Sequence, residues 1–191
     1  MITTIDIEAV NIIDLSVLKK YINWSSHEKY FTLNAGTEHY KLLAYIANSL
    51  EQKTIINIGT CDGLEAAALS INKNNKVITY DYCDLVPLIG SIRDIDNIEI
   101  HVEDFMDSIQ IMLDSSMIVI NLHPHDSYEE KNILNMLFEK NYDGLIVLTN
   151  INVTPGMRKL WANITQNKYD VTRYGFWGGT GLICSNKIIL N

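Results

Sequence analysis

Residues 54–70 constrain the fold more than any other stretch of the sequence. They begin with Thr54-Ile-Ile-Asn-Ile58, a β-branched run that is too short for a helix and is typical of a buried parallel strand. Gly59 and Gly63 follow directly, and the residues after them carry apolar side chains at helical spacing. The sequence therefore predicts a strand, a tight turn and a helix that packs on a sheet.

The turn is also a candidate ligand site. A glycine turn at a helix N-terminus brings backbone N–H groups and the positive end of the helix dipole towards a ligand. About twenty residues further on, the expected strand 76–81 ends in Asp81, where nucleotide-binding βαβ units place a carboxylate that accepts from ribose hydroxyls. The alternative is that Gly59 and Gly63 only satisfy the steric demands of the turn. The turn and the spaced acid together favour a nucleotide-type site.

Two pairs of polar residues have the spacing of a capping box. They are Asp62 with Glu65, at the start of the helix after the glycine turn, and Ser127 with Glu130, after the apolar run 117–122. We expect each pair to begin a helix. A third helix begins at Thr154-Pro155, a good N-cap and first helical residue.

Length and composition indicate an ordinary globular protein. The chain has 191 residues, of which 47% are hydrophobic, and this suits one domain with a helical N-terminal segment over 1–53 and a core over 54–191. Its net charge of -8 disfavours a nucleic-acid or anionic-membrane surface, which needs clustered Lys and Arg. No secretory signal is present, and three cysteines without metal-type spacing suit reduced thiols. We expect a cytoplasmic protein with a small-molecule partner; it could form oligomers.

Strand and helix patterns alternate from residue 54 through most of the chain. Strands are expected at 76–81, 98–102, 117–122 and 145–148, and helices at 84–93, 105–113, after 127 and after 154. The last two strands, 169–174 and 182–184, are too close for a helix between them and should pair antiparallel. This predicts an α/β fold with a mostly parallel sheet, helices on both faces and an antiparallel C-terminal hairpin.

The first fifty residues are expected to be helical at about 12–22 and 38–50. Between these helices, 24–36 is polar and aromatic without periodicity. It either covers a cofactor or substrate or is a surface loop.

The sum of these elements resembles the class I S-adenosylmethionine-dependent methyltransferases, whose Rossmann-like sheet has seven strands and an antiparallel last hairpin. The resemblance spans Thr54 to about Ser185 and implies S-adenosylmethionine as the cofactor. It implies that Asp81 holds the ribose hydroxyls and that Asp104 lies beside the adenine. The methionine part would be wrapped by the turn residues Gly59, Thr60, Cys61, Asp62 and Gly63.

Three further motifs look like a small-molecule O-methyltransferase branch, whose members methylate sugars and other hydroxyl-bearing molecules. They are His123-Pro-His-Asp126, Pro155-Gly-Met157 and Trp177-Gly-Gly-Thr-Gly181. The resemblance therefore implies O-methylation of a sugar, a glycan or a similar small acceptor. Trp177 would form a wall of the acceptor pocket, or else pack beside a hairpin turn.

His123, His125 and Asp126 lie in one loop at the expected strand ends. A histidine can take the acceptor proton near neutral pH, and Asp126 could orient its ring. The resemblance selects His125 as the base. Alternatively, Asp126 or Ser127 serves only as a helix N-cap.

The chain departs from metal-assisted members of this family, which carry carboxylates at the ends of the fourth and fifth strands. Asn121, Thr149 and Asn150 stand there instead, and Asn57 fills a slot in the first strand that often holds an acid. Amide oxygens can coordinate Mg²⁺ or Mn²⁺ but supply no charge, so we assign no metal ligands.

Two rival functions use the same pattern. A non-catalytic binding or subunit module could keep the fold after losing the carboxylates. An NAD-dependent oxidoreductase would use the same strand, turn and helix, but Gly59 to Gly63 lacks the G-x-G-x-x-G spacing.

Overall fold

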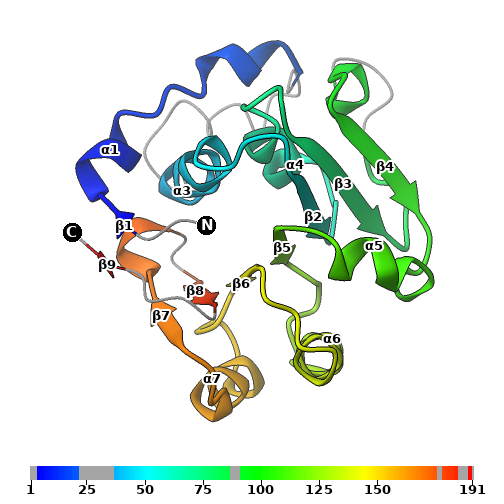
Figure 1. Cartoon of the computed structure of the whole chain (residues 1–191), viewed down its shortest axis with the longest axis vertical. Helices are drawn as coiled ribbons and strands as arrows, with labels where there is room; N and C mark the ends of the chain where they lie inside the picture. The colour runs from blue at the N-terminus through cyan, green and yellow to red at the C-terminus, as the bar shows by residue number, and fades with distance from the viewer. Residues whose placement is uncertain (1–3, 22–36, 87–90, 176–177, 185–188, 191) are drawn as a thin grey trace.

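The computed structural model describes residues 4–21, 37–86, 91–175, 178–184 and 189–190, and it is built around one large sheet (Figure 1). Seven strands follow the order β4-β3-β2-β5-β6-β8-β7, parallel except for β8, which runs antiparallel to both of its neighbours. Their bounds are β2 Thr54–Ile58, β3 Lys76–Asp81, β4 Ile98–Val102, β5 Met117–Ile120, β6 Leu145–Thr149, β7 Lys168–Asp170 and β8 Thr180–Ile183. The predicted fold class, including its antiparallel C-terminal hairpin, is confirmed.

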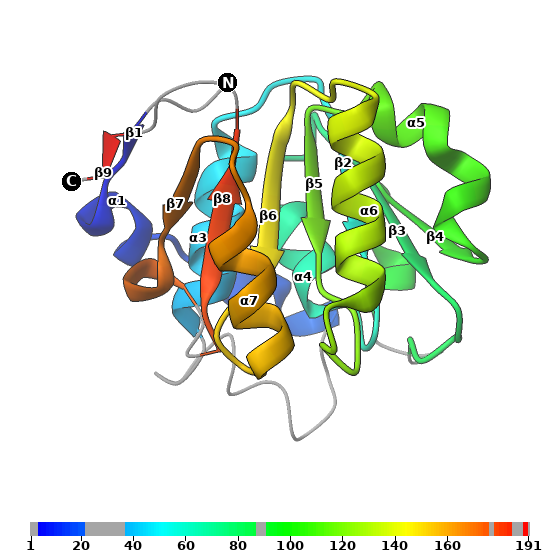
Figure 2. The same cartoon turned by 90° about the horizontal axis from the view of Figure 1, so that it is seen from below.

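Helices cover both faces of the sheet, with α6 and α7 on one side and α3 and α4 on the other (Figure 2). The α-helices are α1 Ile7–Asn11, α3 Thr37–Asn48, α4 Leu64–Leu69, α5 Ile109–Leu113, α6 Tyr128–Glu139 and α7 Pro155–Asn163. Short 3-10 helices are η1 Ser16–Tyr21, η2 Ile92–Asp94, η3 Phe105–Ser108 and η4 Thr172–Tyr174.

The central strands are mostly apolar because both of their faces are buried, with Asn57 in β2 and Thr149 in β6 as buried polar residues. Side chains alternate along β5: Val119 packs in the core under α3 and α4, and Ile118 and Ile120 pack in the core under α6 and α7. The hydrophobic run of each central strand thus divides between two cores, and the sheet is the middle of three layers.

The strand order reverses between β2 and β5, which are neighbours in the sheet but far apart in the chain. In open α/β sheets, ligands bind beyond the carboxyl ends of the strands at such a switch point. The arrowheads of β5 and β6 point to the lower edge of the molecule in Figure 2, which is therefore the edge where a site is expected.

The two ends of the chain meet in a small sheet that sequence patterns did not predict. β1 (Thr4–Ile5) pairs in parallel with β9 (Ile189–Leu190), and both lie at the same side of Figure 1. Two-residue strands carry too little periodicity to be recognised.

Several predicted elements need correction. The helix expected at 84–93 is wrong: residues 84–86 are not helical, 87–90 lie outside the described residues, and only η2 is helical. Arg93 pairs with Asp84, whereas nine helical residues would separate them by about 13 Å. The strand expected to reach Tyr174 ends at Asp170, and the expected helix 105–113 divides into η3 and α5. Within the early segment expected at about 12–22 the structure has the 3-10 helix η1, and α1 lies before that segment.

Both predicted capping boxes are also wrong. Gly63 and Ser127 are the N-cap residues of α4 and α6, each with a positive φ, 91° and 79°, and neither accepts a cap hydrogen bond through a side chain of its own. Glu65 and Glu130 turn inward instead and are buried.

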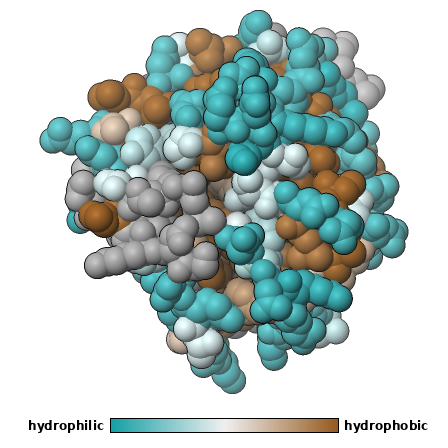
Figure 3. Space-filling view, viewed as in Figure 1, coloured by the Kyte–Doolittle hydropathy of each residue, from teal (hydrophilic) through white to brown (hydrophobic). Residues whose placement is uncertain are grey.

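The face seen in Figure 3 mixes hydrophilic and hydrophobic residues. Within the described residues, no helix is both long enough and apolar enough to cross a membrane.

Candidate functional site

The glycine turn after β2 is packed tightly against two neighbouring strands. The N–H groups of Gly59 and Thr60 donate to the Tyr80 carbonyl of β3 at 2.9 and 3.1 Å. Gly59 has φ 95°, and a Cβ there would lie 1.9 Å from the carbonyl oxygen of Asn121. A Cβ at Gly63, also at positive φ, would meet the Ile92 side chain. Steric demand therefore accounts for both glycines, and their contact with a ligand stays a prediction.

Asp81 ends β3 beside this turn. Its Oδ2 accepts from the N–H of Cys61 at 2.8 Å, and its Oδ1 accepts from the N–H of Cys83 at 3.3 Å. An ionised carboxylate has about four lone-pair positions, so Asp81 can accept two further hydrogen bonds from a ligand. Its side chain is oriented before any ligand arrives.

Asp104 follows β4 at the same edge and caps η3, accepting from the N–H of Met106 at 2.9 Å. Asp104 therefore has a structural role as a helix cap, and its contact with adenine stays a prediction. Cys61, at φ 47°, has an exposed side chain. Partial burial of its sulfur, followed by the negative charge of Asp62, raises the pKa of the Cys61 thiol and so disfavours the reactive thiolate.

Acidic side chains gather around this edge. Burial raises the pKa of Glu129, and repulsion from Glu130, Asp126 and Asp104 raises it further. Burial likewise raises the pKa of Tyr82, with smaller contributions from Glu129, Asp104 and Asp81. Residues from the loops after β3, β4 and β5 thus produce a shared negative potential, which favours a cationic ligand.

The histidine loop after β5 brings His125 to the edge. Its Nε2 lies 3.3 Å from Nδ2 of Asn150, and its Nδ1 lies 3.9 Å from Oε1 of Glu130. Asp126 accepts from the N–H of Tyr128 at 2.9 Å and so supports the start of α6. The carboxylate of Glu130 thus lies near the His125 ring, and the orienting role suggested for Asp126 stays a prediction.

His123 is exposed, and its ring centre lies 5.8 Å from that of His125. The loop encloses a small cavity of about 80 Å³, lined by both histidines together with Tyr128, Glu129 and Glu130. Trp177 lies outside the described residues. Gly178 and Gly179 accept through their carbonyls from residues 152 and 151, so the described end of that glycine segment is packed on the loop after β6.

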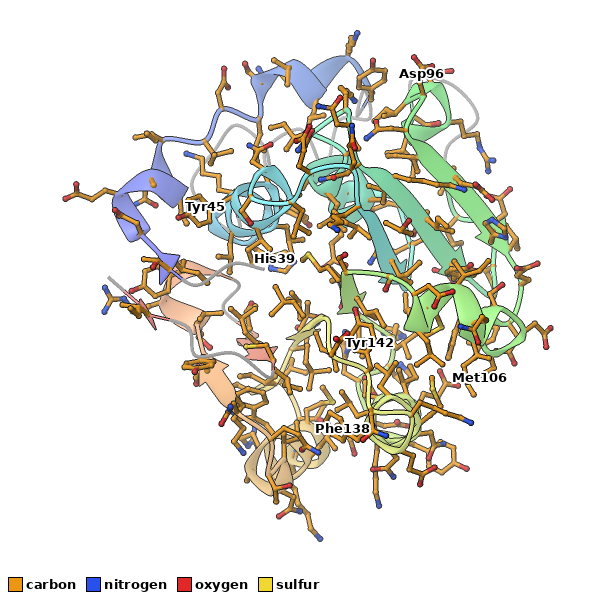
Figure 4. All side chains as sticks on the ribbon, in the orientation of Figure 1. His39, Tyr45, Asp96, Met106, Phe138 and Tyr142 are labelled. Carbon is orange, nitrogen blue, oxygen red and sulfur yellow. The ribbon has the colours of Figure 1, made fainter. Side chains whose placement is uncertain are left out.

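A buried polar network runs beneath the edge, and its central residue, Glu65, was not recognised as functional from the sequence. Glu65 sits in the first turn of α4 and is 5% exposed. Its Oε1 accepts from His39 Nε2 at 2.7 Å and from Asn121 Nδ2 at 2.8 Å, and its Oε2 accepts from Asn57 Nδ2 at 3.1 Å. His39 comes from the face of α3 that meets the sheet (Figure 4). The signal in the sequence was a single acid in an otherwise apolar helix, Leu-Glu-Ala-Ala-Ala-Leu.

The network continues along the strand ends in both directions. Asn121 Oδ1 accepts from Asn150 Nδ2 at 3.0 Å, which links the ends of β5 and β6. On the other side, Asn57 Oδ1 accepts from Thr79 at 3.0 Å, and Thr79 shares a 2.7 Å hydrogen bond with Thr60 in the turn. Glu65 therefore holds Asn57 and Asn121 directly, and Asn121 in turn holds Asn150.

This arrangement does not fit a divalent metal ion. Asn121 Oδ1 is already an acceptor for Asn150, and both oxygens of Glu65 are in use. Across the part of the chain that the structure describes, no group of three or more His, Cys, Asp or Glu side chains is placed to hold a metal. Mg²⁺ and Ca²⁺ need several oxygen ligands, including carboxylates, so the amides do not form such a site.

Comparison with known proteins reveals a shared fold without close sequence relatives. No family model and no curated protein matches the chain. Among solved structures, cofactor-bound Rv0187 from MTB is 14% identical, with a TM-score of 0.56 over 95% of this chain and 90% of that one. The SAH-bound methyltransferase PaMTH1 of Podospora anserina is 12% identical, with a TM-score of 0.57 over 93% and 87%.

A putative O-methyltransferase from Klebsiella pneumoniae is 14% identical, with a TM-score of 0.54 over 94% and 89% of the two chains. These likenesses extend over almost the whole chain, including the N-terminal segment. The chain therefore has the Rossmann-like fold of S-adenosylmethionine-dependent methyltransferases.

Proposed function

We propose that this protein is an S-adenosylmethionine-dependent O-methyltransferase that acts on a sugar, a glycan or another small hydroxylated acceptor. The observation that carries the proposal is the Asp81 carboxylate, held by the amide of Cys61 at the end of β3, next to the glycine turn and the switch point. The fold shared with a SAH-bound methyltransferase supports it. The proposal divides into cofactor binding and acceptor activation.

The residues at the edge fit the proposed cofactor. Asp81 has free lone pairs for two ribose hydroxyls, and it is fixed in place by two backbone amides. The turn from Gly59 to Gly63 would hold the methionine part, and Asp104 would lie beside the adenine. The acids that raise the pKa of Glu129 supply negative potential for a sulfonium cation.

His125 is the proposed base. S-adenosylmethionine supplies a methyl group on a positively charged sulfur, and the acceptor oxygen forms its bond to that carbon as the carbon–sulfur bond breaks. Nε2 of His125 takes the hydroxyl proton, while Glu130 lies beside Nδ1 and favours the charged ring that results. The 3.3 Å contact from Asn150 to Nε2 is long enough to yield to an acceptor hydroxyl.

The acceptor itself is proposed from the chemistry of the loop. The cavity at His125 is small, about 80 Å³, so it suits one hydroxyl-bearing group rather than a whole large ligand. The negative surroundings disfavour phosphate-rich acceptors such as nucleic acid. A neutral polyhydroxylated molecule fits both properties.

Calorimetric titration with S-adenosylmethionine and S-adenosylhomocysteine, with and without Mg²⁺ or Mn²⁺, tests the cofactor. We expect micromolar binding that is independent of the metal and is at least tenfold weaker in Asp81→Ala. The absence of binding under every condition would contradict the proposal. A matched titration with NADH distinguishes the oxidoreductase alternative, for which we expect no heat.

One observation favours a second candidate function. Asn57 and Asn121 donate to Glu65, and Asn150 donates to Asn121, so neutral amides stand along the strand ends; this suits a binding or subunit module that no longer turns over. Such a module would bind S-adenosylmethionine without consuming it. Mass spectrometry after incubation with a panel of sugars separates the two functions, because only the enzyme produces S-adenosylhomocysteine and an acceptor heavier by one methylene.

A further inference from the structure

Glu65 is the buried acid that the proposed reaction leaves unused. Burial of a carboxylate is costly unless N–H groups solvate it, and three side chains do so here at 2.7, 2.8 and 3.1 Å. These donors come from three elements: α3, β2 and the end of β5. A residue that bonds to three elements can determine how side chains at the strand ends are oriented.

The donor and acceptor capacity of each group fixes the direction of the hydrogen bonds. An ionised carboxylate only accepts, so the Asn121 atom that meets Glu65 must be its nitrogen. The oxygen of Asn121 then faces Asn150, which must present its own nitrogen, at 3.0 Å. The orientation of the Asn121 amide thus determines which atom Asn150 presents to it.

The same reasoning reaches the histidine. Nδ2 of Asn150 lies 3.3 Å both from Nε2 of His125 and from Oγ1 of Thr149, and an amide nitrogen can only donate. A proton on Nε2 would therefore point at another donor. Nε2 must therefore carry the lone pair, and in the neutral ring the proton resides on Nδ1, which faces Glu130 at 3.9 Å. A lone pair on Nε2 is what a base needs.

We propose that Glu65 is a positioning residue that sets the tautomer of His125 by directing the hydrogen bonds of Asn121 and Asn150. Its interest for catalysis rests on the proposed function, in which His125 is the base. The tautomer itself does not depend on that function. Glu65 does not touch the acceptor; it acts through two asparagines.

The two oxygens of Glu65 serve different arms of the network, and this yields a matched pair of variants. Oε1 serves the arm to His125, and Oε2 serves the arm through Asn57 and Thr79 to Thr60. In Glu65→Gln, the amide oxygen can keep the place of Oε1 while the NH₂ group faces a flipped Asn57. Glu65→Met has a similar length and no acceptor, so it releases both arms.

Long-range ¹H–¹⁵N spectra of the histidine rings test the proposal on the full chain without cofactor or acceptor, at a pH where the ring is neutral. We expect the unprotonated nitrogen of His125 to be Nε2 in the wild-type protein and in Glu65→Gln. In Glu65→Met we expect at least half of the His125 rings to carry the proton on Nε2 instead, so the signal of unprotonated Nε2 should fall to half or less. Dispersed backbone amide spectra verify that each variant is folded.

Two results would overturn the proposal: a wild-type ring with its proton on Nε2, or a folded Glu65→Met protein that keeps the wild-type pattern. Asn121→Leu breaks the arm to His125 while leaving Glu65 paired with His39 and Asn57, so it gives the same test if Glu65→Met does not fold. A protein that does not bind S-adenosylmethionine would contradict the proposed function, but its histidine ring spectra could still show the expected tautomer. Failure of the proposed function is therefore distinguishable from failure of the proposal for Glu65.

Discussion

The backbone N–H of Cys61 donates to Oδ2 of Asp81 at 2.8 Å, which ties the glycine turn after β2 to the carboxylate that ends β3. The other carboxylate oxygen accepts from Cys83. One side chain thus shapes the turn and presents the lone pairs proposed for the ribose. Loss of this side chain should affect binding and local stability together.

Asp81→Ala should weaken S-adenosylmethionine binding at least tenfold, which corresponds to about 1.4 kcal/mol. It should also lower the free energy of unfolding by about 1 kcal/mol, because two backbone amides lose their acceptor. Calorimetry and urea denaturation measure the two effects. Asp114→Ala is the control: Asp114 accepts from Gln110 on an exposed surface after α5 and should leave affinity unchanged. Equal affinities for all three proteins would contradict the assignment of Asp81.

Cys61 should react slowly with iodoacetamide at neutral pH. Burial, followed by the charge of Asp62, raises its thiol pKa, so the reactive thiolate is scarcer at a given pH and increases only at higher pH. Asp62→Asn removes one cause and should move the alkylation curve of Cys61 to lower pH. Peptide mass spectrometry follows Cys61 and uses Cys83 in the same chain as an internal reference. An unshifted curve in the variant would show that Asp62 does not influence the thiol.

The regular part of the fold was predictable because each central strand carries its own signal. The run Met117 to Ile120 is apolar on both faces, and the run Ile55 to Ile58 is apolar except for Asn57, as is typical of a strand buried between two helical layers. The antiparallel hairpin followed from a connection too short for a helix. These signals are local, so they can be recognised in a single sequence without knowledge of the fold.

The network at the strand ends was not predictable, because it depends on contacts between distant residues. Spacing alone made Glu65 and Glu130 capping residues, yet the folded chain turns both inward, where Asn57, Asn121 and His125 lie. Local rules miss such a choice because long-range polar contacts decide it. The sequence predicted that His125 lies at the carboxyl ends of the strands, but only the structure places Glu130 next to its ring.

His101 should make stability depend on pH. Burial alone would lower its pKa, but hydrogen bonds with Glu99 and Glu103, at 2.6 and 3.0 Å, outweigh burial and raise it above the usual 6.5. A group with a raised folded pKa stabilises the protein fully below its unfolded pKa, and that stability is lost as the pH rises through the folded value. His101→Asn should therefore destabilise the protein more at about pH 5.5 than at about pH 8.5.

Urea denaturation of the wild-type protein and His101→Asn at both pH values measures this difference. The pKa of Glu99 is lowered, mainly by its hydrogen bond with Lys76 and then by His101, so its contribution is present above 4.5 and lost only in more acidic solution. The comparison at the two pH values consequently isolates the histidine. The same destabilisation at both would show that the ring is not charged in the folded protein.

Lys168 should be a strong determinant of stability at the end of α7. That helix has no basic residue in its last turn, and the ammonium group of Lys168, from β7, donates to the carbonyls of Ala162 and Ile164 at 3.0 and 2.8 Å and also to that of Trp161. These donors satisfy carbonyls that the helix end leaves free and complement the negative end of its dipole.

Lys168→Met keeps most of the side-chain length and removes the charge, so it should lower the free energy of unfolding by about 2 kcal/mol. For a chain of this size, that corresponds to a fall in Tm of about 4 to 8 °C. Lys159→Met, on an exposed position of the same helix, is the matched control and should change Tm by less than about 2 °C. Calorimetric melting of the three proteins decides the matter: equal melting temperatures for the two variants would mean that the carbonyls of α7 are satisfied by water and that Lys168 has no special role.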